Sequence, residues 1–258
     1  MECIIFEIKE STAIIMLNRP EKFNAITGPM ALRLQSILDD CAVDKSIRSI
    51  YLTGNGRAFC AGQDLSELSG DDAPGFDRIL AEHYNPIVSR IRSIEKPVVC
   101  AVNGVAAGAG ANIALCCDIV VAAASASFIQ AFSKVGLIPD SGGTFTLPRL
   151  VGFQKAMAFM MLGDRVSAAD AEKYGMLYKV FADDVFAAES MKIATVLAAM
   201  PTKALAYTKQ ALNASLHNSF EAQLRVEDKL QFAAANTYDY NEGVAAFLEK
   251  RAPVFKGE

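Results

Sequence analysis

The sequence predicts an α/β fold with a strand-rich front part and a helical back part. Before Phe153, short runs rich in β-branched residues alternate with helical patterns, and two of these runs are followed by loops of small residues. From Phe153 onward, almost every segment has the apolar spacing of a helix. A chain of 258 residues is long enough for one large domain with a buried core and added helices.

The strand-rich part is expected to begin with a hairpin, because residues 3–8 and 12–17 are two β-rich runs separated by polar residues. Thr27 is expected to cap a helix that continues to residue 43, with Pro29 in its first turn. A helical pattern also covers residues 75–94. Further strands are expected at 47–53, 98–102, 119–123 and 127–132. A strand, a loop and a helix therefore recur along this part.

The back part is expected to contain six helices, the last of which ends before Pro253. They are expected at residues 153–162, 167–175, 184–200, 202–213, 219–236 and 240–251. The apolar segment 97–128 is interrupted by Asn103, Asn112 and Asp118, so its apolar runs are shorter than a membrane helix requires. We therefore expect this segment to lie in the protein core, and we expect no membrane partner.

The net charge and the cysteine content indicate which partners and which location to expect. The formal net charge of −4 provides no basic surface for a nucleic-acid backbone, so we expect no nucleic-acid partner. The six cysteines include no C-x-x-C pair, and several lie in apolar runs, which is typical of reduced thiols and indicates a cytoplasmic location. The amino-terminal residues also lack the basic region and the small-residue cleavage site of a signal peptide.

The segment "PDSGGT", residues 139–144, is similar to the sequence around the nucleophile of trypsin-like serine proteases. A serine nucleophile needs a histidine base, and the chain has only His83 and His217, neither in a suitable context. Ser141 is therefore expected to be an early residue of a helix, and His83 a surface or hydrogen-bonded residue. The two histidines and unpaired cysteines form no recognisable metal site, and no nucleotide-binding fingerprint is complete.

Two loops of small residues remain, each after a predicted strand: "AFCAGQDL" at 58–65 and "NGVAAGAGAN" at 103–112. Small side chains let a ligand approach the backbone, and N–H groups at the start of a helix carry partial positive charge. Two such groups that converge on one point would form an oxyanion hole. The alternative is that the small residues only allow close packing of helices and strands.

Six motifs in order resemble the crotonase superfamily, also called the enoyl-CoA hydratase/isomerase family. They are "NRPEKFNAI" at 18–26, "AFCAGQDL" at 58–65, the segment 96–120, "KVGLIPDSGGTFTLPRLVG" at 134–152, "AEKYGML" at 171–177 and "EGVAAFLEKRAPVF" at 242–255. The resemblance implies a right-handed spiral of β-β-α repeats followed by a helical trimerisation region. We accordingly assign residues 1–195 to an acyl-CoA-binding and catalytic core, and 196–258 to oligomerisation as a homotrimer or dimer of trimers.

The resemblance also implies site residues. In the family, a thioester carbonyl lies between two backbone N–H groups, and the matching residues are Ala61 and Ala109. Positions expected near CoA or the acyl group are Lys22, Asn24, Ala25, Ile26, Gly62, Gln63, Asp64, Leu65, Tyr84, Gly108, Phe132 and Lys250. For the two lysines the alternative is a solvated surface charge, and for Tyr84 it is a core aromatic. CoA would enter as part of the substrate, without a separate cofactor.

The general base determines the reaction. Hydratases of the family carry two glutamates, but the matching positions hold Asn112 and Phe132, and neither is a carboxylate. The nearest carboxylate is Asp140, which would either cap the following helix or act as the acid/base. The segment 131–144 is especially similar to an isomerase branch that rearranges a ring-epoxide thioester in phenylacetate catabolism. An apolar wall that includes Phe132 would raise the pKa of Asp140.

The favoured hypothesis is an acyl-CoA isomerase that moves a proton with one carboxylate. Three alternatives stay open: an enoyl-CoA hydratase, a dehalogenase-like enzyme with Asp140 as nucleophile, and a binding protein without catalysis.

Overall fold

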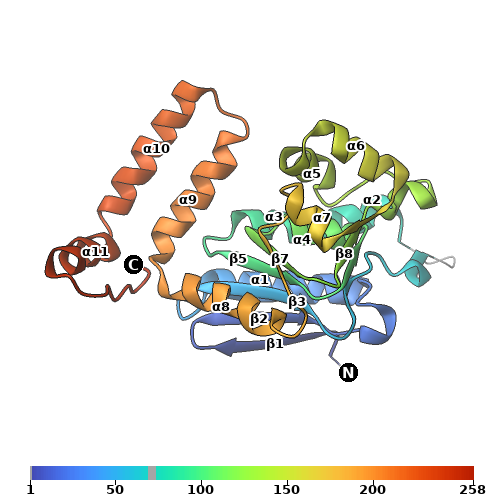
Figure 1. Cartoon of the computed structure of the whole chain (residues 1–258), viewed down its shortest axis with the longest axis horizontal. Helices are drawn as coiled ribbons and strands as arrows, with labels where there is room; N and C mark the ends of the chain where they lie inside the picture. Colours follow the sequence, from blue (N-terminus) through green and yellow to red (C-terminus); the bar gives the residue numbers. More distant parts are fainter. Residues whose placement is uncertain (1, 69–73) are drawn as a thin grey trace.

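The computed structural model describes residues 2–68 and 74–258. Two β-sheets and their covering helices form the main body, and three C-terminal helices project away from it (Figure 1). The α/β fold class with a strand-rich front part and a helical back part is confirmed. None of the helices in the described ranges combines the length and hydrophobicity that a bilayer crossing requires.

The larger sheet has six strands in the order β1-β2-β3-β5-β7-β10. Its strands are β1 (Ile4–Lys9), β2 (Thr12–Leu17), β3 (Ser49–Gly54), β5 (Val98–Val102), β7 (Ile119–Ala123) and β10 (Lys179–Phe181). The smaller sheet has the order β4-β6-β8-β9, with β4 (Ala58–Cys60), β6 (Val105–Ala107), β8 (Ser127–Ile129) and β9 (Arg165–Ser167). The pairs β1–β2 and β8–β9 are antiparallel, and the other neighbours are parallel.

Successive strand pairs build both sheets together. In β3–β4, β5–β6 and β7–β8 the first strand joins the larger sheet and the second joins the smaller one. Each pair adds one parallel strand beside the previous pair in both sheets. Helices follow the pairs, so the expected spiral of β-β-α repeats is present. It places the carboxyl ends of β4 and β6 side by side.

The helices of the main body begin and end as follows. They are α1 (Gly28–Val43), α2 (Phe76–Arg78), the π-helix η3 (Ile79–Tyr84), α3 (Asn85–Ser93), α4 (Ala109–Leu115), α5 (Gly143–Val151), α6 (Phe153–Leu162), α7 (Ala168–Lys173) and α8 (Phe186–Ala199). Short 3-10 helices are η1 (Pro20–Lys22), η2 (Leu65–Leu68) and η4 (Ala131–Val135). Thr27 caps α1 as expected, since its hydroxyl accepts the Met30 N–H at 3.4 Å.

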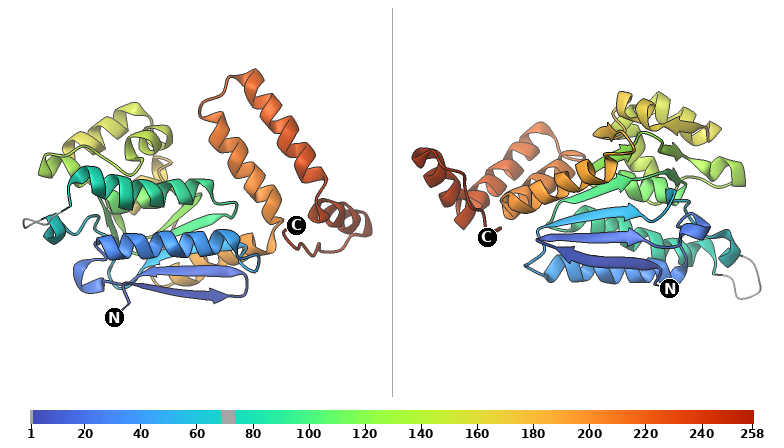
Figure 2. Two further views of the ribbon diagram at one scale, coloured as in Figure 1. Left: turned by 180° about the vertical axis from the view of Figure 1, so that it is seen from behind. Right: turned by 60° about the horizontal axis from the view of Figure 1, so that its bottom comes forward.

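The C-terminal helices are α9 (Thr202–Ser215), α10 (Phe220–Ala235) and α11 (Tyr238–Glu249). α9 and α10 form an antiparallel pair, and α11 lies beside the start of α9, at the end of the pair opposite the loop that joins α9 to α10 (Figure 2). α8 packs against the larger sheet and leads into them. The division that we placed between residues 195 and 196 falls within α8 and stays a prediction.

Three local expectations were wrong. The strand expected to continue to Phe132 ends at Ile129, because the chain turns into η4. Neither an Asp140 cap nor a helical Ser141 is present: α5 begins at Gly143 without a side-chain cap. Ser141 has φ 51°, in a turn that the Gly143 N–H closes by donating to the Asp140 carbonyl at 2.8 Å.

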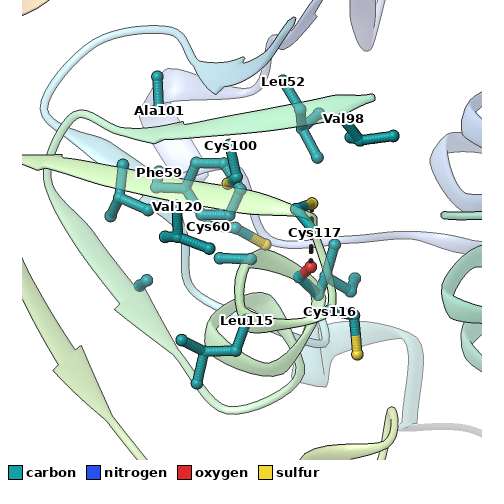
Figure 3. Close-up of a cluster of buried hydrophobic side chains, with 14 of the residues drawn as sticks. Leu52, Phe59, Cys60, Val98, Cys100, Ala101, Leu115, Cys116, Cys117 and Val120 are labelled. Atoms are coloured by element: carbon teal, nitrogen blue, oxygen red, sulfur yellow. Dashed lines mark hydrogen bonds between the residues drawn. The ribbon is translucent and has the colours of Figure 1, made fainter. Parts of the chain in front are cut away.

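The core between the sheets and α4 contains apolar and thiol side chains, shown in Figure 3. Phe59, Cys60 and Cys100 are completely buried there. Burial raises the pKa of the Cys60 thiol to about 12 and that of Cys116 to about 11, so both stay protonated and pack as small hydrophobic groups. This packing fixes α4 against β4, which matters for the site below.

Candidate active site

A cavity of about 130 Å³ lies where the segment after β4 meets the start of α4, η3 and the segment before α5. Larger hollows lie beside Arg48 and on the C-terminal helices, but the predicted residues converge in this smaller one. Nine predicted residues line it: Ala61, Gly62, Gln63, Leu65, Tyr84, Gly108, Ala109, Phe132 and Asp140. The cavity is therefore the candidate active site.

The two loops of small residues meet at the cavity because glycines remove the side chains between them. A Cβ on Gly110 would lie 2.5 Å from the Cys60 carbonyl oxygen, so α4 packs directly on β4. A Cβ on Gly62 would lie 3.4 Å from the Ala109 nitrogen. Ala109 is the first residue of α4, and its N–H donates to no partner among the described residues. This group is an unsatisfied donor at the positive end of the helix.

The second expected donor is engaged in this structure. The Ala61 N–H donates to the Phe23 carbonyl oxygen at 3.0 Å. To bind a thioester oxygen, the Ala61 N–H must either release the Phe23 carbonyl oxygen or donate to both oxygens. The neighbouring Gly62 N–H donates to the Cys60 sulfur at 3.5 Å, which is a weak acceptor. Ala109 is thus the more available donor, and the oxyanion role of Ala61 stays a prediction.

The segment expected to contact CoA is tied to the loop after β4. The Ile26 N–H donates to the Gly62 carbonyl at 2.7 Å, and the Asp64 N–H donates to the Ile26 carbonyl at 2.9 Å. The fully buried Asn24 side chain donates to the Ala58 carbonyl at 2.8 Å. Asn24, Ala25 and Ile26 are all buried, and none of them lines the cavity. Their CoA contacts stay predictions.

Asp64 does not line the cavity and forms an ion pair with Arg19 at 2.8 Å. Its pKa is lowered, first by the Ser66 hydroxyl at 2.6 Å and then by the Arg19 guanidinium. Arg19 also donates to the Ala25 carbonyl at 2.5 Å. The ion pair therefore joins the segment before α1 to the loop that carries Ala61.

Asp140 is the carboxylate at the cavity, and it is partly buried. Burial beside apolar groups such as Phe132 and Leu137 raises its pKa, while the Ser141 hydroxyl, which donates to Asp140 Oδ1 at 2.7 Å, and a backbone N–H oppose the rise. An acid/base needs a raised pKa if it is to accept and return a proton near neutral pH.

Tyr84 both lines the cavity and is buried, so it is at once a cavity residue and a core aromatic. Burial raises its pKa, and the protonated hydroxyl donates to Gln63 Oε1 at 2.8 Å. The Gln63 amide donates in turn to Glu67, whose carboxylate accepts the Gly28 N–H at the start of α1 at 3.0 Å. Gln63 is therefore held by hydrogen bonds on both sides of its amide.

Two lysines lie outside the cavity. Lys22 is exposed at the end of η1, and Lys250 is exposed directly after α11, a helix that lies apart from the main body (Figure 2). His83, expected at the surface or hydrogen-bonded, is instead buried, and its Nδ1 has no partner among the described residues. It lies beneath the start of α1, close to Gly28. Within residues 2–68 and 74–258, no cluster of His, Cys, Asp and Glu could hold a metal.

Part of the cavity wall consists of residues that the sequence did not predict. The additional lining residues are Leu68, Phe76, Ile79, Ala131, Val135 and Leu137. Phe76 and Ile79 are three residues apart in the helical pattern at 75–94, a spacing that predicts a shared face. The apolar residues of η4 carried no such signal, because that segment was expected to continue a strand. Ser141, dismissed as a nucleophile, proves to be the hydrogen-bond donor to Asp140.

Residues 7–258 match the model of the enoyl-CoA hydratase/isomerase family, and the chain belongs to this enzyme family. Among curated relatives, it is 45% identical to 1,2-epoxyphenylacetyl-CoA isomerase of Escherichia coli (strain K12) and 35% identical to 2,3-dehydroadipyl-CoA hydratase of the same organism, over 100% of both chains in each case. The crystal structure of enoyl-CoA hydratase from Bacillus anthracis superposes with a TM-score of 0.93 at 31% identity, covering 100% of each chain.

Proposed function

We propose that this protein is an acyl-CoA isomerase that shifts a double bond or rearranges a ring-epoxide thioester by proton transfer through one carboxylate. The observation that carries the proposal is that Asp140 is the acidic residue lining the cavity, within the described part of the chain. Asn112 and Phe132 occupy the two positions where hydratases of the family carry glutamates. A hydratase must activate water, and among residues 2–68 and 74–258 no second carboxylate lines this cavity to support that task.

The proposed reaction needs only one base. The Asp140 carboxylate removes a proton from one carbon of the acyl chain, and the electron pair of that C–H bond delocalises onto the thioester oxygen. The N–H of Ala109 stabilises the developing charge, joined by that of Ala61 when the substrate replaces the Phe23 carbonyl. The protonated Asp140 then returns the proton to another carbon, which completes the isomerisation.

The test is a panel of CoA thioesters: linear 3-enoyl, 2-enoyl and 1,2-epoxyphenylacetyl, each assayed separately for double-bond migration, ring rearrangement and hydration. We expect migration or ring rearrangement to exceed hydration by at least about tenfold, because each 1.36 kcal/mol of lost transition-state stabilisation slows a reaction by that factor. Robust hydration of the 2-enoyl thioester would contradict the proposal. Entry of ¹⁸O from solvent water into the Asp140 carboxylate would instead indicate the nucleophilic mechanism.

The identity of the relatives supports the ring-epoxide branch. The relative at 45% identity is named 1,2-epoxyphenylacetyl-CoA isomerase, and relatives named as a probable enoyl-CoA hydratase and as 2,3-dehydroadipyl-CoA hydratase are at 43% and 35%. We therefore propose a role in phenylacetate or related aromatic or fatty-acid catabolism. The proposed location is the cytoplasm, supported by six cysteines that are all free thiols. CoA is proposed to enter as part of the substrate, without a separate cofactor.

We further propose that the C-terminal helices α9 to α11 mediate assembly into a homotrimer or a dimer of trimers. Phe232, Phe247 and Leu248 are 74%, 82% and 73% exposed in the single chain. Large exposed apolar side chains are typical of protein interfaces, and Phe247 and Leu248 line one hollow of these helices. Lys250 lies beside this surface, so a CoA molecule that contacts Lys250 would be bound in the active site of a neighbouring copy of the chain.

Phe247→Glu combined with Leu248→Glu is expected to reduce the mass measured by light scattering from that of three or six chains to a smaller assembly, because two charges cannot be buried in an apolar interface. The control is Ile8→Glu on β1, which is 46% exposed and should leave the mass unchanged. An unchanged mass of the double variant, or a monomeric parent protein, would contradict the assembly.

A further inference from the structure

Two buried amides that the proposed reaction does not use form a hydrogen-bonded chain behind Asp140. Asn112 on α4 is fully buried, and Gln130, directly after β8, is 3% exposed. Gln130 Nε2 donates to Asn112 Oδ1 at 2.8 Å, and Asn112 Nδ2 donates to the main-chain oxygen of Asp140 at 2.8 Å. Neither side chain lines the cavity. The hydrogen-bonded chain connects α4 and the end of β8 to the backbone of the proposed acid/base.

The direction of this chain is determined by chemistry. The Asp140 carbonyl can only accept, so the atom of Asn112 that faces it must be the NH₂ group. The Asn112 oxygen then faces Gln130 and needs a donor, which is the Gln130 NH₂ group. Gln130 Oε1 is buried and has no partner among the described residues. The contact of Gln130 with Asn112 is thus the hydrogen bond that orients the Gln130 amide.

The bond from Asn112 fixes the turn that carries Asp140. The Asp140 carbonyl also accepts the Gly143 N–H at 2.8 Å, so two donors hold this one oxygen. The next two residues, Ser141 and Gly142, have φ angles of 51° and 75°. A serine in this left-handed region is strained and persists only when its surroundings hold it. The absence of a Cβ on Gly143 makes room for the Asn112 amide against the start of α5.

The same turn orients the reactive groups of the site, because the Ser141 hydroxyl donates to the Asp140 carboxylate at 2.7 Å. Rotation of the peptide after Asp140 would displace both the carboxylate and this hydroxyl. We propose that Asn112 and Gln130 are positioning residues, which hold the Asp140 carboxylate and the Ser141 hydroxyl in the cavity through the main chain of Asp140. This inference rests on the proposed role of Asp140 as the acid/base.

Gln130→Met tests it, since methionine keeps the length of the side chain and removes the donor. A displacement of catalytic groups by about 1 Å can cost 10²-fold in rate, so we expect kcat to fall by about 10- to 100-fold and KM to change less than about twofold. Asn112→Ala should lower kcat to the same extent. Because Gln130 acts through Asn112, the double variant should lose no more than Asn112→Ala alone.

The matched control is Gln223→Met, which removes an amide hydrogen bond of 3.0 Å to the Ala211 carbonyl in the C-terminal helices and should leave kcat unchanged. A second readout is hydrogen exchange of residues 139–145, which contain the Gly143 N–H. Exchange there should become at least about tenfold faster in Gln130→Met and Asn112→Ala, because the acceptor of that N–H is no longer fixed.

An unchanged kcat in Gln130→Met, losses that multiply in the double variant, or unchanged exchange at 139–145 would each overturn the inference. The exchange measurement does not depend on the reaction. If Asp140→Asn kept its turnover, the proposed function would fail, whereas faster exchange in Gln130→Met would still show that the pair holds the turn.

Discussion

Asp140→Asn is expected to lower the kcat for isomerisation of the best thioester by about 10²- to 10⁴-fold, the usual contribution of a positioned acid/base. Asparagine keeps the shape of the side chain and an oxygen that can accept the Ser141 hydroxyl, but it cannot take up a proton. The cavity and the Ala109 N–H should be unaffected, so KM should change little. Steady-state kinetics with the thioester identified by the substrate panel measure both constants.

The control for this variant is its folding stability as a function of pH. Burial raises the pKa of Asp140 above that of the unfolded chain, where aspartate has a pKa of about 3.9. The folded protein therefore keeps this proton over a pH range in which the unfolded chain has lost it, and the stability falls as the pH rises through that range. Asn carries no such charge, so Asp140→Asn should unfold at a higher temperature than the parent at pH 8. The difference should disappear below pH 3.9.

The pKa of Asp64 is shifted in the opposite direction, so its contribution to folding stability changes with pH in the opposite sense. Its pKa is lowered by the Ser66 hydroxyl and by Arg19, so its contribution to stability is present above the unfolded pKa and is lost as the pH falls through the lowered folded value. The parent protein therefore loses stability in acid through Asp64, although protonation of Asp140 favours the folded state. Only the difference between the parent and Asp140→Asn isolates Asp140. Near-parental turnover of Asp140→Asn would remove this residue from the mechanism.

The sequence predicted the strands of the larger sheet better than those of the smaller one. Runs such as 98–102 are long and rich in β-branched residues, which is a strong local signal. β4 and β6 contain three residues each and lie inside what we expected to be loops of small residues. Such short strands are specified by their parallel neighbours and not by local propensity. The loops were located correctly as ligand-approach sites, but their support by a second sheet was not predicted.

The same limit applies to the candidate site. The sequence indicated that Asn112 could not be a carboxylate base, but its contact with the Asp140 carbonyl joins residues 28 positions apart and depends on the turn at Ser141. The bond from the Ala61 N–H to the Phe23 carbonyl likewise depends on the pairing of residues 23–26 with 61–64. Residue types identified the candidates, and only the tertiary structure determined which of their hydrogen-bonding groups are free.

Gly108→Ala is expected to lower kcat by about 10²- to 10³-fold, the cost of losing one oxyanion donor. Gly108 precedes α4 with φ 54° and ψ −129°, a conformation that is accessible essentially only to glycine. Space is not the obstacle, because the nearest side-chain atom to an added Cβ would be on the Phe132 ring at 3.9 Å. The strain of about 1–3 kcal/mol would be relieved by rotation of the peptide that carries the Ala109 N–H. That rotation turns the donor away from the cavity.

Gly152→Ala is the matched control. Gly152 precedes α6 with φ 78° and ψ 159°, no atom lies within 4 Å of an added Cβ, and the residue does not line the cavity. Both variants should therefore lose a similar amount of thermal stability, since both place an L-residue in a conformation that favours glycine. Only Gly108→Ala should lose kcat. Equal kcat losses in the two variants would mean that strain alone is responsible, and a parental kcat in Gly108→Ala would exclude the Ala109 N–H as an oxyanion donor.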